Sequence, residues 1–138
     1  MNIIKICIFS FVLFLQVRPF VLCQESLNYS QKKTIMIDLD GVLNEYKQYN
    51  ETGIPKIRDG AKEFIKKLSD NYNLVLFTSR NSKTAVKWLI ENNLDEYFQN
   101  VTNVKTPAYI YLDDRGINFN GNYENALKDI ENFKVYWK

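Results

Sequence analysis

The stretch TIMIDLDG, residues 34–41, decides the fold. Its first part, TIMIDL, is a nearly continuous apolar run, which is typical of a strand buried in a parallel sheet. Asp38 and Asp40 lie two residues apart where this run ends, so their side chains leave the strand on the same side. Two neighbouring carboxylates repel each other and are costly to bury. The pair therefore indicates a bound cation.

Further strands and helices alternate along the rest of the chain. Residues 74–77 and 109–112 are predicted to be buried strands, and a weaker strand is predicted near residues 101–104. Helices are predicted from apolar residues at helical spacing: Ala61, Phe64, Ile65 and Leu68 after Asp59; Ala85, Val86, Leu89 and Ile90 after Asn81 or Ser82; and Tyr123, Ala126, Leu127 and Ile130 after Asn122. This order favours right-handed βαβ units. The expected fold class is α/β, a three-layer Rossmann-like parallel sheet with helices on both faces.

The segment between the first strand and the first helix, residues 41–57, contains Gly41, Gly53 and Pro55 and has no usable period. It predicts a loop or small flap, and therefore a minimal cap or none over the site. A chain of 138 residues with 46% hydrophobic content can bury one core but has no room for a second ordinary domain. One domain is expected over residues 34–137.

A second carboxylate pair, Asp113 and Asp114, follows the apolar run YIYL. In open parallel sheets the ligand site lies beyond the carboxyl ends of the strands, where both pairs would sit. Oxygen ligands without histidine or cysteine suit Mg²⁺ better than zinc. An isolated Asp more often caps a turn or a helix, but two pairs after two buried strands favour a metal site.

Hydroxyl and amine groups complete the candidate site. Thr78 ends the run LVLF and offers a hydroxyl and a backbone amide to a phosphoryl oxygen, although strand-end Thr and Ser are usually turn residues. Lys105 lies in a loop before the last strand and could neutralise a phosphate or the aspartates. A solvated surface lysine is its default interpretation.

The composition excludes several classes of function. Histidine is absent, which excludes His-based phosphorelays, Ser/His/Asp triads and histidine-ligated metals. The formal charge of +2 comes from Lys5 and Arg18, since the remaining 16 basic residues balance 16 acidic ones. There is no electrostatic case for a nucleic-acid partner.

Residues 1–23 are predicted to be a cleaved secretory signal peptide. They contain an early lysine, an apolar run over residues 6–15 and then a polar break. The run is too short to cross a bilayer, which takes about 20 residues, so no stable membrane span is expected. The mature protein would begin at Gln24 and be secreted, lumenal or periplasmic. An uncleaved anchor or a misplaced start is the alternative.

The predicted signal peptide also affects which disulfides and glycosylation sites are expected. Cys7 and Cys23 both lie in the predicted signal, so the mature domain would need no disulfide. The sequons at Asn28, Asn50 and Asn100 would be glycosylated only if the source is eukaryotic and the signal is real.

The motif order DLDG, apolar-TSR, lysine and apolar-DDR resembles the four motifs of the haloacid dehalogenase (HAD) superfamily, over nearly the whole chain from Thr34 onward. The tail KTPAYIYLDDRGINFNG resembles a small branch of that superfamily. The resemblance implies a Mg²⁺-dependent phosphatase that hydrolyses a phosphate monoester through an aspartyl phosphate. It implies these roles: Asp38 as nucleophile, Asp40 as general acid and base, Thr78, Ser79 and Lys105 as phosphoryl-binding residues, and Asp38, Asp40 (through its main-chain carbonyl), Asp113 and Asp114 around the metal.

Three alternatives stay open. A response-regulator receiver domain carries its acidic pair on the first strand and the phosphorylated Asp on a later one, whereas here the DLDG segment opens the set. A haloalkanoate dehalogenase would use the same nucleophile but would need neither Asp40 nor Mg²⁺. A catalytically inactive relative would bind only a phosphate or a partner.

Overall fold

The computed structural model describes residues 32–48 and 53–137. The predicted signal peptide, residues 1–23, and the sequons at Asn28 and Asn50 lie outside this described part. No helix among the described residues is long and apolar enough to span a membrane.

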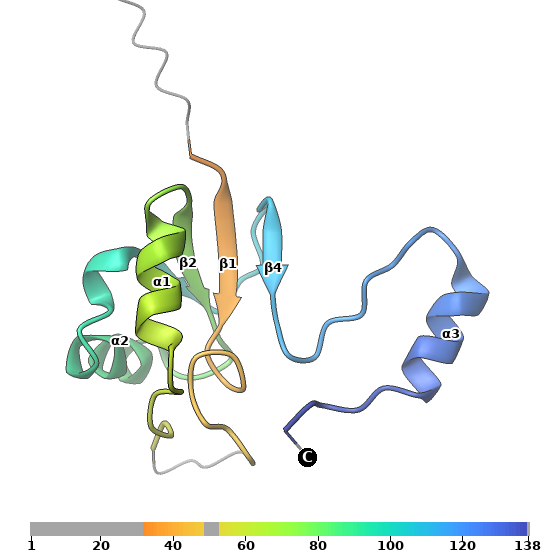
Figure 1. Cartoon of the computed structure of the whole chain (residues 1–138), viewed down its shortest axis with the longest axis horizontal. Helices are drawn as coiled ribbons and strands as arrows, with labels where there is room; N and C mark the ends of the chain where they lie inside the picture. The colour runs from red at the N-terminus through yellow and green to blue at the C-terminus, as the bar shows by residue number, and fades with distance from the viewer. Residues whose placement is uncertain (1–31, 49–52, 138) are drawn as a thin grey trace, which may run out of the picture.

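Four parallel strands form the sheet. They are β1 (Thr34–Asp38), β2 (Asn73–Phe77), β3 (Phe98–Thr102) and β4 (Ile110–Leu112), in the order β3-β2-β1-β4. β1 lies between β2 and β4 and pairs in parallel with both (Figure 1). The predicted α/β fold with an open parallel sheet is confirmed. The exposed sequon residue Asn100 lies on β3.

Two helices follow the first two strands. α1 (Ala61–Ser69) is preceded by Gly60 at φ 81°, and no side chain caps it, so the predicted capping role of Asp59 is wrong. α2 (Ser82–Glu91) begins after Asn81, whose side-chain oxygen accepts hydrogen bonds from two backbone amides of the first turn. Such a cap satisfies amide groups that have no partner inside the helix, and it was one of the two predicted starts.

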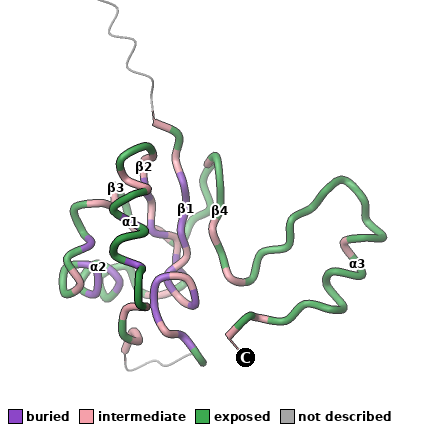
Figure 2. The backbone as a smooth tube through the Cα atoms, in the orientation of Figure 1, coloured by how far each residue is buried: buried purple, intermediate pink, exposed green. Residues whose placement is uncertain are grey.

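The core fills the space between these two helices and one face of the sheet (Figure 2). Its buried members come from two strands and two helices. They include Ile35 and Ile37 of β1, Leu39 just after β1, Leu74 and Leu76 of β2, Ala61 and Ile65 of α1, and Ala85, Trp88 and Leu89 of α2. Alternate residues of a strand point to the same face, so α1 and α2 cover the same side of the sheet.

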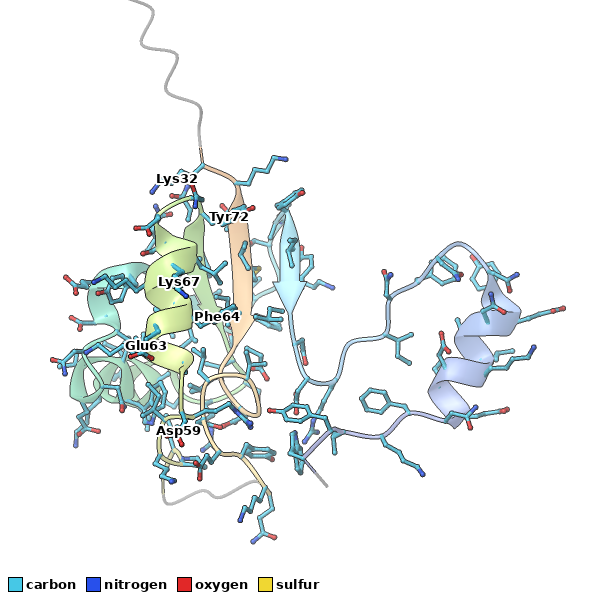
Figure 3. All side chains as sticks on the ribbon, viewed as in Figure 1. Lys32, Asp59, Glu63, Phe64, Lys67 and Tyr72 are labelled. Carbon is cyan, nitrogen blue, oxygen red and sulfur yellow. The ribbon has the colours of Figure 1, made fainter. Side chains whose placement is uncertain are left out.

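The helix faces differ in part from those predicted. Phe64, Val86 and Ile90 were expected inside and are exposed, whereas Trp88 is buried and donates its indole N–H to the Pro55 carbonyl at 2.9 Å. Figure 3 shows Phe64 with Glu63 and Lys67 on α1. Short helices on a small sheet bury a narrow stripe, so only part of each apolar pattern is covered.

A loop, rather than a helix, covers the other face of the sheet. Met36 of β1 points to this face and is fully buried, with the Thr106 hydroxyl 3.6 Å from its sulfur. The Tyr111 hydroxyl donates to the Thr106 carbonyl at 2.6 Å. The connection from β3 to β4, residues 103–109, is shorter than the roughly twelve residues that a helical crossover takes. The second helical layer is therefore not formed by the described residues.

α3 (Tyr123–Glu131) begins after Asn122, as predicted, but stands away from the sheet beyond β4 (Figure 1). Its apolar residues Tyr123, Leu127 and Ile130 are 79%, 60% and 60% exposed, so the prediction that they point inward is wrong. A helical period identifies an apolar face but not the surface that covers it. After α3 the chain returns to the loop that follows β1 (Figure 1).

The connection from β1 to α1 forms a small flap in its described parts. It opens with a tight turn in which the amides of Leu43 and Asn44 donate to the Leu39 carbonyl at 3.0 and 3.2 Å. The Glu45 amide donates to the Lys56 carbonyl at 3.0 Å, which brings the two arms of the flap together. No helix or strand element lies in the described parts of this flap, so they do not form a separate domain over the carboxyl edge of the sheet.

Candidate active site

Polar residues gather at the carboxyl ends of the four strands. Asp38 is the last residue of β1, Thr78 follows β2, Asn103 lies just after β3 and Asp113 follows β4. Parallel strands end at the same edge of a sheet, so these residues meet there. A cavity of about 430 Å³ opens at this edge; its lining residues are Asp38, Asp40, Tyr46, Phe77, Ser79, Asn103, Asp113 and Arg115.

Three carboxylates in this region form a candidate metal site. Asp38, Asp113 and Asp114 each offer an oxygen, and these oxygens lie within 4.8 Å of one another. The donor set is purely carboxylate, which fits a hard cation such as Mg²⁺. The Arg115 amide donates to Asp113 at 2.8 Å and orients that carboxylate.

Asp38 is the most perturbed of these groups. The pKa of its carboxyl is raised from the ordinary 3.8 to about 7, chiefly by burial, with smaller contributions from the charges of Asp113, Asp40 and Asp114. A hydrogen bond from the Leu39 amide acts in the opposite direction on that pKa. The ionised form of Asp38 is therefore costly until a cation or hydrogen-bond donors compensate its charge.

This shift predicts how stability depends on pH in the metal-free protein. The unfolded chain loses the Asp38 proton near pH 3.8 and the folded chain near pH 7, so the folded state is penalised increasingly as pH rises between these values. Asp38→Asn removes the penalty. The melting temperature of the variant minus that of the parent, measured in EDTA, should therefore be larger at about pH 8 than at about pH 5.

Asp70→Asn is the matched control for this measurement. Asp70 is an exposed residue that caps the end of α1 just before β2, at the opposite edge of the sheet. Its difference from the parent should be the same at both pH values. An Asp38→Asn difference that does not change with pH would contradict the buried-carboxyl interpretation.

Asp40 is held by two donors rather than placed in the carboxylate cluster. The Arg80 guanidinium donates through Nε to one carboxylate oxygen at 2.6 Å, and the Asn44 amide donates to the other at 2.8 Å. The ion pair is largely buried, with side-chain exposures of 7% for Arg80 and 16% for Asp40. Arg80 also donates to the Gly53 carbonyl at 3.0 Å, which ties the pair to the flap.

The two predicted hydroxyl residues are placed differently. Thr78 is buried and its hydroxyl oxygen accepts a hydrogen bond from the Arg80 amide at 3.2 Å, so it shapes the turn after β2. Ser79 is exposed and lines the cavity. Of the two, Ser79 is the one that lines the cavity.

Lys105 does not line the cavity. Its ammonium lies 4.2 Å from the centre of the Tyr111 ring, a cation–π contact over the loop-covered face of the sheet. The missing helix before β4 explains this position, because the loop that carries Lys105 follows the sheet face. Among the described residues, Arg115 is the basic residue that lines the cavity.

Sequence reasoning gave no role to several residues of this region. Arg115 directly follows the strand-end carboxylates Asp113 and Asp114, a signal that could have found it. Arg80 follows Thr78 and Ser79 and has no such neighbour in the sequence. Tyr46 lines the cavity from the flap. No periodicity or motif marks it or Asn44 beforehand.

Comparison with known proteins agrees with this architecture. A solved structure described as the conserved protein coded by a locus from Bacteroides thetaiotaomicron is similar in fold, with a TM-score of 0.51 and 20% sequence identity, covering 76% of this chain and 94% of that one. No curated protein matches the chain. The family model of NLI interacting factor-like phosphatases matches residues 33–104, just over half of the chain. This matched range includes Asp38, Asp40 and Thr78 and ends before Lys105. The chain therefore belongs to the NLI interacting factor-like phosphatase family, a family of HAD-like phosphatases.

Proposed function

We propose that this protein is a Mg²⁺-dependent phosphatase that hydrolyses a phosphate monoester through an aspartyl phosphate on Asp38. The observation that carries the proposal is the arrangement around Asp38. This carboxylate borders the cavity, lies beside Asp113 and Asp114 in a purely carboxylate cluster, and is followed two residues later by the separately held Asp40. The proposed nucleophile is thus itself a member of the proposed cation site, and the proposed proton-transfer group lies two residues away with partners of its own.

The chain's own residues would share the reaction as follows. A carboxylate oxygen of Asp38 attacks phosphorus and forms an acyl phosphate while the ester oxygen leaves. Asp40 gives a proton to the leaving alkoxide and later takes one from the water that hydrolyses the intermediate, which restores both carboxyl groups. Both oxygens of Asp40 have partners here, so Arg80 or Asn44 has to give way when Asp40 meets the leaving oxygen.

Asp38, Asp113 and Asp114 are the residues that would hold Mg²⁺. When bound, the cation neutralises the carboxylates and spreads the charge of the transferring phosphoryl group. Arg115 and Ser79 both line the cavity, which supports a role for them in contacting phosphate oxygens. Arg115 lies 3.9 Å from an Asp114 oxygen, so its charge also offsets that of the cluster.

The small size of the flap beside the cavity affects which substrates can reach the site. The described parts of the flap contribute Tyr46 to the cavity but do not form a separate domain over it. Such a site admits a phosphate carried on a bulky molecule as well as a small one.

An activated aryl phosphate tests the proposed activity. The parent protein should release phenol in Mg²⁺, lose that activity in EDTA and regain it when excess Mg²⁺ is restored. Asp129→Asn, a carboxylate change on the exposed helix α3, should behave like the parent. Release that persists in EDTA would contradict metal dependence. The inactive alternative, a protein that binds only a phosphate or a partner, would be favoured if no phenol is released from aryl phosphates. It would also require that no inorganic phosphate is released from a panel of nucleotides, sugar phosphates, phospholipid head groups and phosphopeptides.

A further inference from the structure

The last described residues of the chain contact the candidate active site directly. After α3 the chain returns to the loop that follows β1 (Figure 1). There the Tyr136 hydroxyl donates a hydrogen bond to the Gly41 carbonyl, and the Trp137 indole N–H donates to a carboxylate oxygen of Asp114. The first of these bonds joins residues 95 positions apart at the DLDG turn, and the second joins residues 23 positions apart.

Aromatic packing fixes the orientation of the indole ring. The Trp137 and Tyr46 rings meet edge to face, with centroids 5.2 Å apart and an interplanar angle of 89°. The Arg115 guanidinium lies 5.6 Å from the Trp137 ring and 5.7 Å from the Tyr46 ring. Trp137 is therefore held between the flap and the segment that carries the second carboxylate pair.

Gly41 makes this approach possible. Its φ of +83° disfavours any other residue, and a Cβ at this position would lie 2.9 Å from the Trp137 indole nitrogen and overlap the Asp114 carboxylate. The absence of a side chain at position 41 thus leaves the space in which the indole reaches Asp114.

Asp114 needs such a donor. Its side chain is only 2% exposed and lies in the cluster with Asp38 and Asp113, where like charges repel. An indole N–H donates one hydrogen bond and accepts none, so it engages one oxygen of Asp114 and leaves the other for a ligand. Groups that hydrogen-bond a ligating carboxylate orient it toward a metal and tune metal affinity.

We propose that Trp137 is a positioning residue of the metal site, which orients Asp114 for Mg²⁺ through its indole N–H. This proposal rests on the proposed metal-dependent function and adds to it a contribution from the end of the chain, beyond the range that the family model matches.

Calorimetric titration of the full chain with Mg²⁺ tests the proposal. Trp137→Phe keeps a ring that can pack against Tyr46 and removes the N–H donor, so it should weaken Mg²⁺ binding about 10-fold, the lower end of the usual effect of such partners. Trp88→Phe is the matched control, because it removes the indole donor that binds the Pro55 carbonyl, away from the carboxylates. Its Kd for Mg²⁺ should stay within about two-fold of the parent value, well short of that 10-fold effect.

A spectroscopic signature separates positioning from a merely structural role. Mg²⁺ should change the tryptophan emission of the parent at the same concentrations that saturate the calorimetric signal, and Trp137→Phe should lack this change. Trp137→Phe should lower the melting temperature in EDTA only modestly, because its ring can still pack against Tyr46 and one hydrogen bond is lost. A large fall would overturn the positioning role in favour of a structural one.

The contradicting outcomes are distinct. A parent that binds Mg²⁺ and a Trp137→Phe variant that binds it equally well would overturn this inference and leave the proposed function standing. A parent that binds no Mg²⁺ would contradict the proposed function and the inference together.

Discussion

Asp38→Asn is expected to abolish hydrolysis of every phosphate ester, with kcat/KM falling by about 10⁴-fold or more, the scale on which loss of a covalent nucleophile acts. The amide does not form the acyl phosphate, and the substitution also removes one carboxylate from the cluster with Asp113 and Asp114. The loss should be uniform across aryl and alkyl esters, because the missing step is common to both. Steady-state rates in saturating Mg²⁺ measure it.

Folding is not the cause of this expected loss. Removing the Asp38 carboxyl should stabilise the metal-free protein near neutral pH, since burial raises its pKa to about 7. A variant that is at least as stable as the parent and inactive therefore isolates the chemical role. Turnover by Asp38→Asn above the trace level of a contaminating phosphatase would contradict the nucleophile assignment.

Asp40→Asn should separate substrates by their leaving groups. The variant keeps the nucleophile and the main-chain carbonyl of residue 40, but it does not protonate a leaving alkoxide, and such catalysis is worth about 10² to 10⁴ in rate. A phenolate leaves as a stable anion and needs little of this help. The burst of product from an aryl phosphate should therefore survive better than the burst from an alkyl phosphate.

The ratio of the two bursts is the decisive quantity. Asp40→Asn also removes the charge that faces the buried Arg80 guanidinium, so both bursts could fall through a change in local structure. Such a change affects both esters equally and leaves their ratio unchanged. Equal slowing for the two esters would mean that Asp40 positions other residues rather than transferring protons.

Much of the fold could be predicted because local sequence patterns identify the strands and the alternation of strands with helices. The apolar run over residues 34–37 and the run LVLF give β1 and β2, and both are buried in the sheet. The carboxylates at the strand ends could be predicted to meet, because parallel strands place their carboxyl ends at one edge. Asp38 and Asp113 are the clearest example, since their strands pair directly in the sheet.

The errors concern packing between elements. The period of α3 predicts an apolar face, yet nothing local specifies that the loop over residues 113–122 carries this helix beyond β4. For the same reason, the sequence predicts a wider buried face on α1 and α2 than the structure has, and Phe64 of α1 is exposed. Period reports which residues share a face, while burial depends on the partner surface.

The supporting contacts of the site were beyond prediction for a related reason. Arg80 reaches Asp40 and the flap, and Trp137 reaches Asp114, across separations that no spacing rule covers. The position of Lys105 over Tyr111 likewise follows from the loop that covers the second sheet face. The sheet topology determines where the strand-end carboxylates lie, whereas side-chain packing determines which residues contact them.

The most direct test of the central claim is to trap the phosphoenzyme and locate it. Asp40→Asn should accumulate the acyl phosphate with an aryl phosphate substrate, because the same residue activates the water that clears it. Rapid quenching with borohydride reduces an acyl phosphate to an alcohol, and peptide mass spectrometry then identifies the modified residue. We expect the modification at Asp38 alone, dependent on substrate and Mg²⁺. Modification at another carboxylate, or none during a measurable burst, would contradict the account.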